Sequence, residues 1–305
     1  MKILVSGGAG FIGSNLCKKL KEKDYDVIIV DDLSTGFEDN LIEGCDFYDL
    51  DLSKEDNYKN LPKNIDVVFH LASQVSSEMS FVNPVNDMQR NSYATLLILD
   101  WSLKSSVKKI LYTSSMGVYG SNSKGPSKET SLLSPTSFYG INKRASEEFI
   151  KVYSYKGLEY TIFRLFNVYG PGQDMSNLNQ GMVSIYLEYI LRNKPILVKG
   201  SLDRIRDYVF IEDVIDVLML GLNQKTKNKT YNVCSGEKTS VKKLINSLLL
   251  VMDKSLDYPF TILPETPNDI YQIWGSCDKL IKEFDWLPKF KLNEGLSKFV
   301  QSLKI

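Results

Sequence analysis

The sequence has only one histidine, His70, and only four cysteines in 305 residues. A single imidazole rules out a metal site built on two histidines. The cysteines, Cys17, Cys45, Cys234 and Cys277, show no C-x-x-C pair or other metal-like spacing. We therefore expect no metal and no disulfide framework. His70 follows an apolar run and is expected to be packed, so acid–base chemistry must rest on other side chains.

The chain also lacks net charge, because 37 basic residues balance 37 acidic ones. No overall field exists to hold nucleic acid or an anionic membrane, so an anionic ligand must be bound locally. No stretch approaches roughly 18 consecutive apolar residues. The first apolar run, Ile3–Val5, is too short for the core of a signal peptide. We expect a cytoplasmic protein with no nucleic-acid or membrane partner.

Apolar and β-branched runs alternate with helical patterns through the first half of the chain. The runs span residues 2–6, 26–31, 65–71, 107–114 and 160–166. Their continuity is typical of strands buried on both faces of a parallel sheet. Between the first two runs, Ile12, Leu16 and Leu20 recur every four residues, as on one side of a helix. The alternation predicts an α/β fold with a doubly wound parallel sheet of the Rossmann type.

After Asn167 this alternation loosens, and short helices mix with isolated strands at 196–199 and 231–234. We therefore expect a smaller α/β lobe that binds the substrate. The predicted division is a dinucleotide-binding domain at 1–167, with 207–235 packing back on it, and a substrate-binding lobe at 168–206 and 236–305.

A glycine-rich turn, Gly7-Gly8-Ala9-Gly10-Phe11-Ile12-Gly13, stands between the first expected strand and the first helix. It satisfies G-x-G-x-x-G, in which glycines let backbone N–H groups approach a pyrophosphate at the positive helix N-terminus. Asp31 ends the second expected strand and suits the two ribose hydroxyls of adenosine, whereas a 2′-phosphate would be repelled. NAD is therefore favoured over NADP. Asp32 shares or replaces this role if the register shifts by one residue.

Tyr139 and Lys143 stand at i and i+4 and share one face if their segment is helical. Alone, such a pair is more often a surface feature. It gains weight because Thr113 and Ser115 lie at the end of an expected strand, where side chains reach the crevice of an open sheet. A neighbouring ammonium and a positive nicotinamide both favour the phenolate, so we expect a lowered pKa for Tyr139.

These motifs resemble the extended short-chain dehydrogenase/reductase family, in particular nucleotide-sugar 4-epimerases that act on UDP-glucose and UDP-galactose. The resemblance runs nearly end to end. Besides the residues above, it rests on Asp51-Leu52, His70-Leu71-Ala72-Ser73, Asn91, Val118-Tyr119-Gly120, the segment 164–171 and Arg206-Asp207-Tyr208.

The resemblance implies a role for each matching residue. Tyr139 would be the acid/base, Lys143 a ligand of the nicotinamide ribose, and Ser115, with Thr113 nearby, a partner of the sugar hydroxyl. The implied NAD contacts are Gly7, Gly10, Phe11, Ile12, Gly13, Asp31, Asp32, Asp51, Leu52, Leu71, Ala72, Ser73, Asn91, Tyr139, Lys143 and Phe166. The implied substrate contacts are Ser115, Asn167, Gly181, Met182, Arg206 and Ile273.

The implied reaction inverts C4 of UDP-glucose, UDP-galactose or their N-acetyl forms through a 4-keto intermediate, with NAD carrying the hydride. Family members often form homodimers, and here the helices near 87–103 and 139–155 would pair. Met116 and Gly117 occupy the positions where 4,6-dehydratases carry Asp-Glu, and decarboxylases typically keep a glutamate at the second position. Epimerisation is therefore favoured. A sugar-nucleotide dehydrogenase or reductase and a non-catalytic NAD-binding protein remain the alternatives.

The chain departs from the family pattern at 265–269. Many members have an arginine before Pro-Gly-Asp, but here the sequence reads Glu265-Thr266-Pro267-Asn268-Asp269. The nucleotide therefore stays open, with UDP favoured. The same alignment puts Ile273 where a tyrosine would border the C2 substituent of the sugar, so we expect room for an N-acetyl group there.

Overall fold

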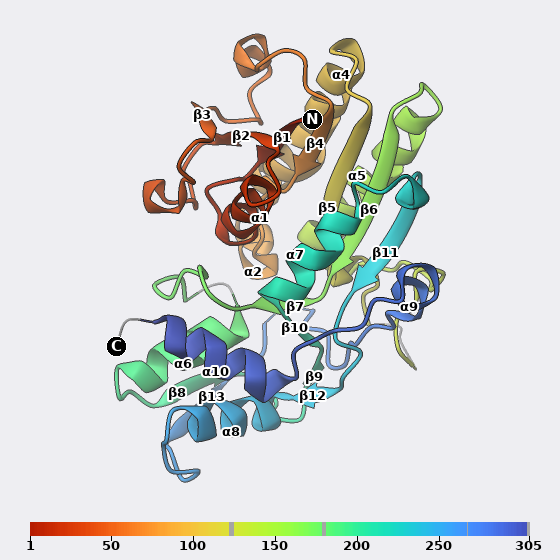
Figure 1. Cartoon of the computed structure of the whole chain (residues 1–305). Helices are drawn as coiled ribbons and strands as arrows, with labels where there is room; N and C mark the ends of the chain where they lie inside the picture. The colour runs from red at the N-terminus through yellow and green to blue at the C-terminus, as the bar shows by residue number, and fades with distance from the viewer. Residues whose placement is uncertain (122–124, 179–180, 267, 304–305) are drawn as a thin grey trace.

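The computed structural model describes residues 1–121, 125–178, 181–266 and 268–303. Its centre is a seven-stranded parallel sheet in the order β11-β6-β5-β4-β1-β2-β3 (Figure 1). The strands are β1 (Lys2–Ser6), β2 (Asp26–Asp31), β3 (Asp46–Asp49), β4 (Val67–His70), β5 (Lys109–Ser115), β6 (Glu159–Leu165) and β11 (Lys229–Val233). The strand order reverses between β1 and β4, which is where an open α/β sheet forms its ligand crevice. The predicted doubly wound fold is confirmed.

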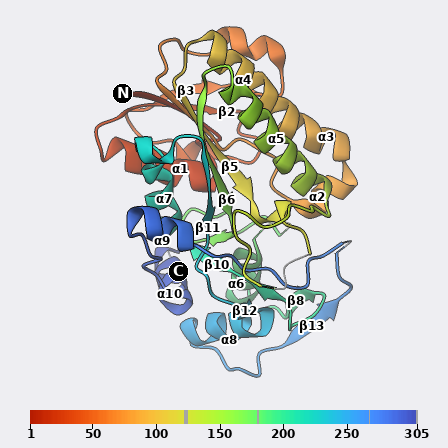
Figure 2. The same ribbon diagram turned by 90° about the vertical axis from the view of Figure 1, so that its right-hand side faces the viewer.

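Helices cover both faces of this sheet (Figure 2). One face carries α1 (Phe11–Lys21) and α7 (Ile211–Leu220), and the other carries α4 (Ala94–Lys104) and α5 (Phe138–Ser154). Alternate strand residues point to opposite faces. Ile3 and Val5 therefore join the core under α1 and α7, whereas Leu4 joins the core under α4 and α5. Burial on both faces explains the continuous apolar runs in the sequence.

Short helical elements connect β4 to α4 along the crevice. They are α2 (Ser77–Val82), α3 (Pro84–Met88) and the π-helical turn η3 (Gln89–Tyr93), which leads into α4. The remaining short turns are η1 (Glu38–Asn40), η2 (Glu55–Asn60), η4 (Met116–Val118) and η5 (Gln224–Thr226).

A second group of elements lies beyond the carboxyl edge of the sheet (Figure 1). It contains α6 (Met182–Leu191), β8 (Ile196–Lys199), β9 (Ile205–Arg206), β12 (Thr239–Ser240), α8 (Val241–Val251), β13 (Phe260–Leu263) and α10 (Leu292–Ser302). β8 pairs with β13, and β9 with β12. β7 (Asn167–Tyr169) pairs with β10 (Tyr208–Phe210), and α9 (Asp278–Phe284) contacts β11. The segment 207–235 supplies α7 and β11, and β11 belongs to the central sheet. We keep the division into domains given above as a proposal.

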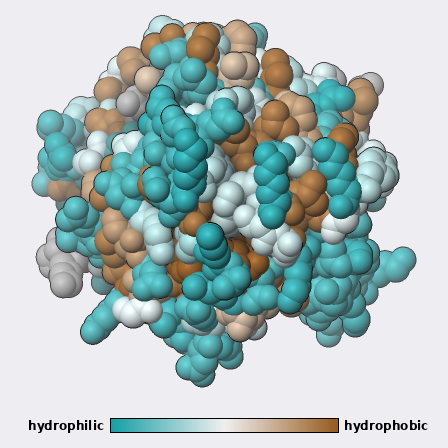
Figure 3. All heavy atoms as spheres, turned by 90° about the horizontal axis from the view of Figure 1, so that it is seen from above, coloured by the Kyte–Doolittle hydropathy of each residue, from teal (hydrophilic) through white to brown (hydrophobic). Residues whose placement is uncertain are grey.

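The central sheet contains one strand, β3, that was not expected from the sequence, and the short strands β7, β9, β10, β12 and β13 outside it were not expected either. β3 is Asp-Phe-Tyr-Asp and lies at the edge of the sheet, where polar ends are tolerated and no apolar run is needed. The other expected strands are present, with ends shifted by one or two residues. The surface seen from above is largely hydrophilic, with hydrophobic groups between the charged side chains (Figure 3). Within the described ranges, every helix is too short or too polar to cross a bilayer.

Candidate active site

A cavity of about 720 Å³ extends from the carboxyl ends of β1, β2, β4 and β5 to the second group of elements. This volume lies within the range of about 300–1,000 Å³ that is usual for ligand sites. Its walls come from segments far apart in the sequence. They include the glycine turn at 7–13, the catalytic candidates of β5 and α5, and residues of α6, β8 and the segment 204–208.

The glycine turn is packed too tightly for any side chain at its key positions. Gly7 has a φ of 73°, and a Cβ there would lie 2.7 Å from the amide nitrogen of Ala72. A Cβ on Gly13 would lie 2.0 Å from the Gly7 carbonyl oxygen. Helix α1 starts at Phe11 without a side-chain cap, so its first amides face the cavity that Phe11, Ile12 and Gly13 line. An anion fits at this helix start.

The two acidic residues at the end of β2 have different partners. The buried carboxylate of Asp31 accepts hydrogen bonds from the amides of Ala9 and Leu33, both at 3.0 Å. Burial raises the pKa of Asp31 despite these bonds. Asp32 instead pairs with Arg90 at 2.8 Å. Both carboxylates line the cavity, and Asp31 also holds the glycine turn in place.

The other expected NAD contacts line the same cavity, with one exception. Gly7, Gly10, Asp51, Leu52, Leu71, Ala72, Ser73 and Phe166 are all in the wall. Asn91 is not. It lies in η3 behind the wall, where its amide donates to the Gln74 carbonyl and to Asp87, both at 3.1 Å. The expectation that Asn91 contacts the cofactor is therefore corrected, because it is buried in a polar network of the protein itself.

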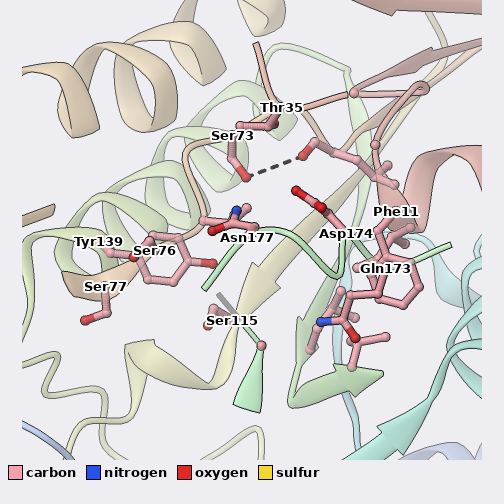
Figure 4. Close-up of a pocket in the computed structure, with 18 of the residues that line it drawn as sticks. Phe11, Thr35, Ser73, Ser76, Ser77, Ser115, Tyr139, Gln173, Asp174 and Asn177 are labelled. Carbon is pink, nitrogen blue, oxygen red and sulfur yellow. Dashed lines mark hydrogen bonds between the residues drawn. The ribbon is translucent and has the colours of Figure 1, made fainter. Parts of the chain in front are cut away.

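Tyr139, Ser115 and Lys143 come together at one end of the cavity. Ser137 caps the start of α5, and the first turn of that helix directs Tyr139 to the Ser115 hydroxyl at the end of β5. In Figure 4, Tyr139 and Ser115 lie across the cavity from Phe11, Gln173 and Asp174. The Lys143 ammonium donates to the Thr113 carbonyl at 2.9 Å and lies 5.7 Å from the centre of the Tyr139 ring. The helical i, i+4 pairing is thus present.

Burial controls the ionisation of this group in the protein alone. It raises the pKa of Tyr139 to about 12, although the hydrogen bond with Ser115 acts in the opposite direction. Burial lowers the pKa of Lys143 to about 7, against the attraction of Asp87 and Glu147. The sequence argument expected Lys143 to lower the pKa of the phenol. In the protein alone, desolvation of the phenolate instead raises the pKa of Tyr139.

His70 is packed, as expected. Its Nδ1 lies 2.7 Å from the Ser6 hydroxyl and its Nε2 lies 3.2 Å from the Thr95 hydroxyl. Burial, with the nearby Lys143, lowers the pKa of His70 to about 3, so the ring is neutral and structural.

The expected substrate contacts separate into two groups. Ser115, Asn167, Gly181 and Met182 line the large cavity, the last two at the start of α6. Arg206 lines a neighbouring cavity of about 180 Å³ and is paired with Asp269 at 2.7 Å. Pro267 lies outside the described residues.

Ile273 does not border either cavity. It is fully buried in the main hydrophobic core, and its amide donates to the Ile205 carbonyl beside β9. The expectation that Ile273 contacts the sugar is therefore corrected, because backbone pairing with β9 turns this side chain into the core.

Three residues that the sequence analysis missed lie in the large cavity. Arg204 is buried and shares the Asp269 carboxylate with Arg206. Its position two residues before Arg206 could have indicated in the sequence that it belongs to the site. Lys199 of β8 pairs with Glu78 of α2 across the cavity at 2.6 Å. This pair joins positions with no sequence relationship, so no local pattern indicates it.

Comparisons with known proteins give similar assignments over the whole chain. A sequence model described as "NAD dependent epimerase/dehydratase family" matches residues 3–234. The UDP-glucose 4-epimerase of Thermotoga maritima, solved with UDP-glucose, is 34% identical with a TM-score of 0.95, over 100% of this chain and 99% of that one. The UDP-N-acetylglucosamine 4-epimerase of Methanobrevibacter ruminantium, solved with UDP-N-acetylmuramic acid, is 29% identical with a TM-score of 0.91, over 99% and 98%.

Similarity also extends to a different reaction. UDP-glucuronic acid decarboxylase 5 of Arabidopsis thaliana is 30% identical over 304 residues, which cover 97% of this chain and 87% of that relative.

Replacing Asp31 tests the cofactor end of the cavity. Asp31→Ala removes the carboxylate beside the expected ribose and the acceptor for two backbone amides. We expect NAD affinity to fall about tenfold or more, with a smaller gap between NAD and NADP, in titrations of cofactor-free protein. Asp32→Ala is the matched control and should leave that gap nearly unchanged. If only the control variant loses NAD, the ribose contact belongs to Asp32.

Proposed function

The chain belongs to the NAD-dependent epimerase/dehydratase family, and from that premise we propose that it inverts C4 of a UDP-sugar. NAD is its cofactor. One observation carries the proposal. The hydroxyls of Tyr139 and Ser115 meet in the wall of one cavity with the Lys143 ammonium behind them, and the same cavity contains the glycine turn.

The residues of the cavity fit NAD. The glycine turn leaves space that a Cβ would fill, and the first amides of α1 face that space. Gln173 Oε1 is a further unused acceptor, since it is buried in the cavity wall and has no hydrogen-bond partner among the described residues. Gly7–Gly13 and Asp31 would hold the adenosine diphosphate half, and Lys143 and Tyr139 the nicotinamide half. When bound, NAD supplies a carrier that takes a hydride from C4 and returns it.

Tyr139 would accept the proton of the sugar 4-hydroxyl and give it back to the same oxygen, while inversion would come from return of the hydride to the opposite face of C4. A phenol with a pKa of about 12 is almost entirely protonated at neutral pH, so Tyr139 needs positive charge nearby to act as a base. Lys143 supplies one such charge, and a positive nicotinamide supplies another. Ser115 would orient the hydroxyl, because its own oxygen already lies within hydrogen-bond reach of the phenol.

Epimerisation is the best supported of the family's reactions for this chain. Elimination of water needs an additional acid and base, and the two residues after Ser115 are Met116 and Gly117, which supply neither. A scaffold without catalysis would not require the Tyr139–Lys143 pair in the cavity wall.

UDP is the nucleotide that we propose, although the arginine before Pro-Gly-Asp is missing. Arg204 lines the same cavity as the start of α6, where Gly181 and Met182 present a helix N-terminus. A guanidinium and a helix start together suit a diphosphate. Ile185, Tyr189 and Leu197 form an apolar wall beside them for a flat base.

We also propose that N-acetylated sugars are accepted, through the smaller cavity rather than at Ile273. This side cavity of about 180 Å³ shares Ser115, Met116 and Tyr139 with the large one and continues to Phe81 and Ile270. It greatly exceeds the roughly 30 Å³ of one water, so it admits a substituent of several heavy atoms. The M. ruminantium relative, which acts on an N-acetylated sugar, supports this proposal.

A homodimer is proposed from an apolar surface on α3 and α5. Ile141 and Val152 are exposed on α5, and Tyr155, directly after its end, is 90% exposed. Val85 and Met88 are exposed on α3 at the neighbouring position. An apolar surface of this kind marks an interface. Pairing of 84–104 and α5 between two copies would cover it.

The proposed compartment is the cytoplasm. All four cysteines carry free thiols. Reduced thiols are typical of that compartment.

Tyr139→Phe tests the reaction. The variant keeps the ring but removes the proton acceptor, so kcat for UDP-glucose should fall roughly 10²–10⁴-fold. Proton NMR of the sugar measures C4 inversion directly in parent and variant. Phe138→Leu, at an exposed neighbouring position, is the control and should stay near the parent. Activity of Tyr139→Phe within threefold of the parent would contradict the assignment.

Ile270→Trp tests the side cavity. The larger ring should fill it and lower kcat/KM for UDP-N-acetylglucosamine about tenfold or more, with little effect on UDP-glucose. Ile270→Leu keeps the volume and serves as control. An unchanged ratio of the two kcat/KM values would place the N-acetyl group elsewhere.

Light scattering tests the dimer. At micromolar concentration the parent should give twice the chain mass of 34.7 kDa. Val152→Glu with Tyr155→Glu should give the monomer, because charges are costly in an apolar interface. Leu250→Glu, on the exposed side of α8, should remain dimeric. A parent that scatters as a monomer refutes the proposal.

A further inference from the structure

Asp87, on α3 behind the cavity wall, is a fully buried carboxylate that the proposed reaction does not use. Its oxygens accept hydrogen bonds only from side-chain amides in the described part of the chain. The donors are Asn142 at 2.6 Å, Gln74 at 2.8 Å and Asn91 at 3.1 Å. A buried charge held by neutral donors alone is costly, so its retention calls for a compensating positive charge nearby.

The three amides connect Asp87 to the elements that form the reactive end of the cavity. Asn142 precedes Lys143 and follows Tyr139 by three residues on α5. Gln74 belongs to the segment that carries Ser73 and Ser76 in the cavity wall. Asn91 belongs to the π-helical turn η3, and such turns occur frequently at functional sites. Asp87 thus links α5 to the segment 73–76 of the cavity wall.

The charges around Lys143 leave Asp87 as its uncompensated partner. His70 on β4 is neutral, and the rings of Tyr112 on β5 and Tyr139 on α5 face the ammonium. Glu147 on α5 is bound by the Arg164 guanidinium at 2.7 Å and by the Ser114 hydroxyl at 2.6 Å. Asp87 and Glu147 both oppose the fall in the pKa of Lys143, and Asp87 has the larger effect because Arg164 offsets the charge of Glu147.

We propose that Asp87 is a positioning residue whose amide network fixes α5 against the cavity wall and whose buried negative charge acts on the Lys143–Tyr139 pair. The proposal rests on the proposed function for the roles of these two residues. It assigns Asp87 two separable effects, one of charge and one of geometry.

The direction of the charge effect follows from the ionisation of the pair. Asp87 opposes the burial that lowers the pKa of Lys143, and it contributes to the raised pKa of Tyr139. Removing its charge therefore lowers both pKa values. The phenolate then forms at lower pH, and the ammonium is also lost at lower pH, so both limbs of the activity profile move in the acid direction.

Asp87→Asn in the purified holoenzyme separates charge from geometry. Tyrosinate absorbance, measured against the same protein carrying Tyr139→Phe, follows the ionisation of Tyr139 without any sugar substrate. We expect the midpoint to move about one pH unit in the acid direction, and both limbs of the kcat profile to move with it. The asparagine amide of Asp87→Asn could clash with the three donors and prevent folding. In that case Asp87→Ser, which also removes the charge, provides the same test.

Gln74→Leu is the matched control, since it removes one hydrogen bond from the same carboxylate and no charge. It should leave the tyrosinate midpoint in place even if kcat falls. A midpoint that is unmoved in Asp87→Asn and Asp87→Ser, or moved equally in Gln74→Leu, overturns the proposal. Failure of the parent to invert C4 would instead count against the proposed function, since the absorbance titration does not depend on turnover.

Discussion

The buried ammonium of Lys143 is the group on which the arrangement of the site depends. A charge removed from water is tolerated only where fixed partners replace the solvent. For Lys143 these partners are the Thr113 carbonyl at the end of β5, the rings of Tyr112 and Tyr139, and the carboxylate of Asp87. β5, α5 and α3 must therefore keep their relative positions for the ammonium to remain charged. The same packing of β5, α5 and α3 therefore serves both the stability of the fold and the reactivity of the site.

The parallel sheet explains where this restraint acts. The carboxyl ends of its strands meet at one edge, and the order β4-β1 opens a crevice there. The second group of elements supplies the opposite wall, with α6 and β8 facing the glycine turn. Lys199 and Glu78 join the two walls, but each side chain is about 40% exposed, and such pairs contribute only about 0–1 kcal/mol. The Lys199–Glu78 pair therefore contributes little to holding the two walls together.

Features set by local sequence could be predicted, and features set by distant contacts could not. The glycine turn and the Tyr139–Lys143 spacing depend on residues close in the chain, so their pattern was sufficient. Ile273 was misplaced because its orientation depends on pairing with Ile205. Arg204 was missed because its role depends on Asp269, which lies in a different segment.

Burial also changes the ionisation expected for the candidate catalytic residues. The sequence put a phenol beside an ammonium and implied a lowered phenol pKa. The structure buries both groups, which raises the pKa of Tyr139 and lowers that of Lys143. The pair therefore depends on surrounding charge more than its spacing indicates. For Asn91 the sequence motif also gave no sign of its surroundings, since its amide donates to Asp87 and the residue does not line the cavity.

We propose that C4 of the sugar loses a hydride and regains it within one cavity. UDP-glucose labelled with deuterium at C4 tests this most directly. The account predicts UDP-galactose that keeps the deuterium at C4, with no label lost to water and no accumulated keto sugar. Loss of the deuterium from C4, or release of a keto product in place of the inverted sugar, would contradict it.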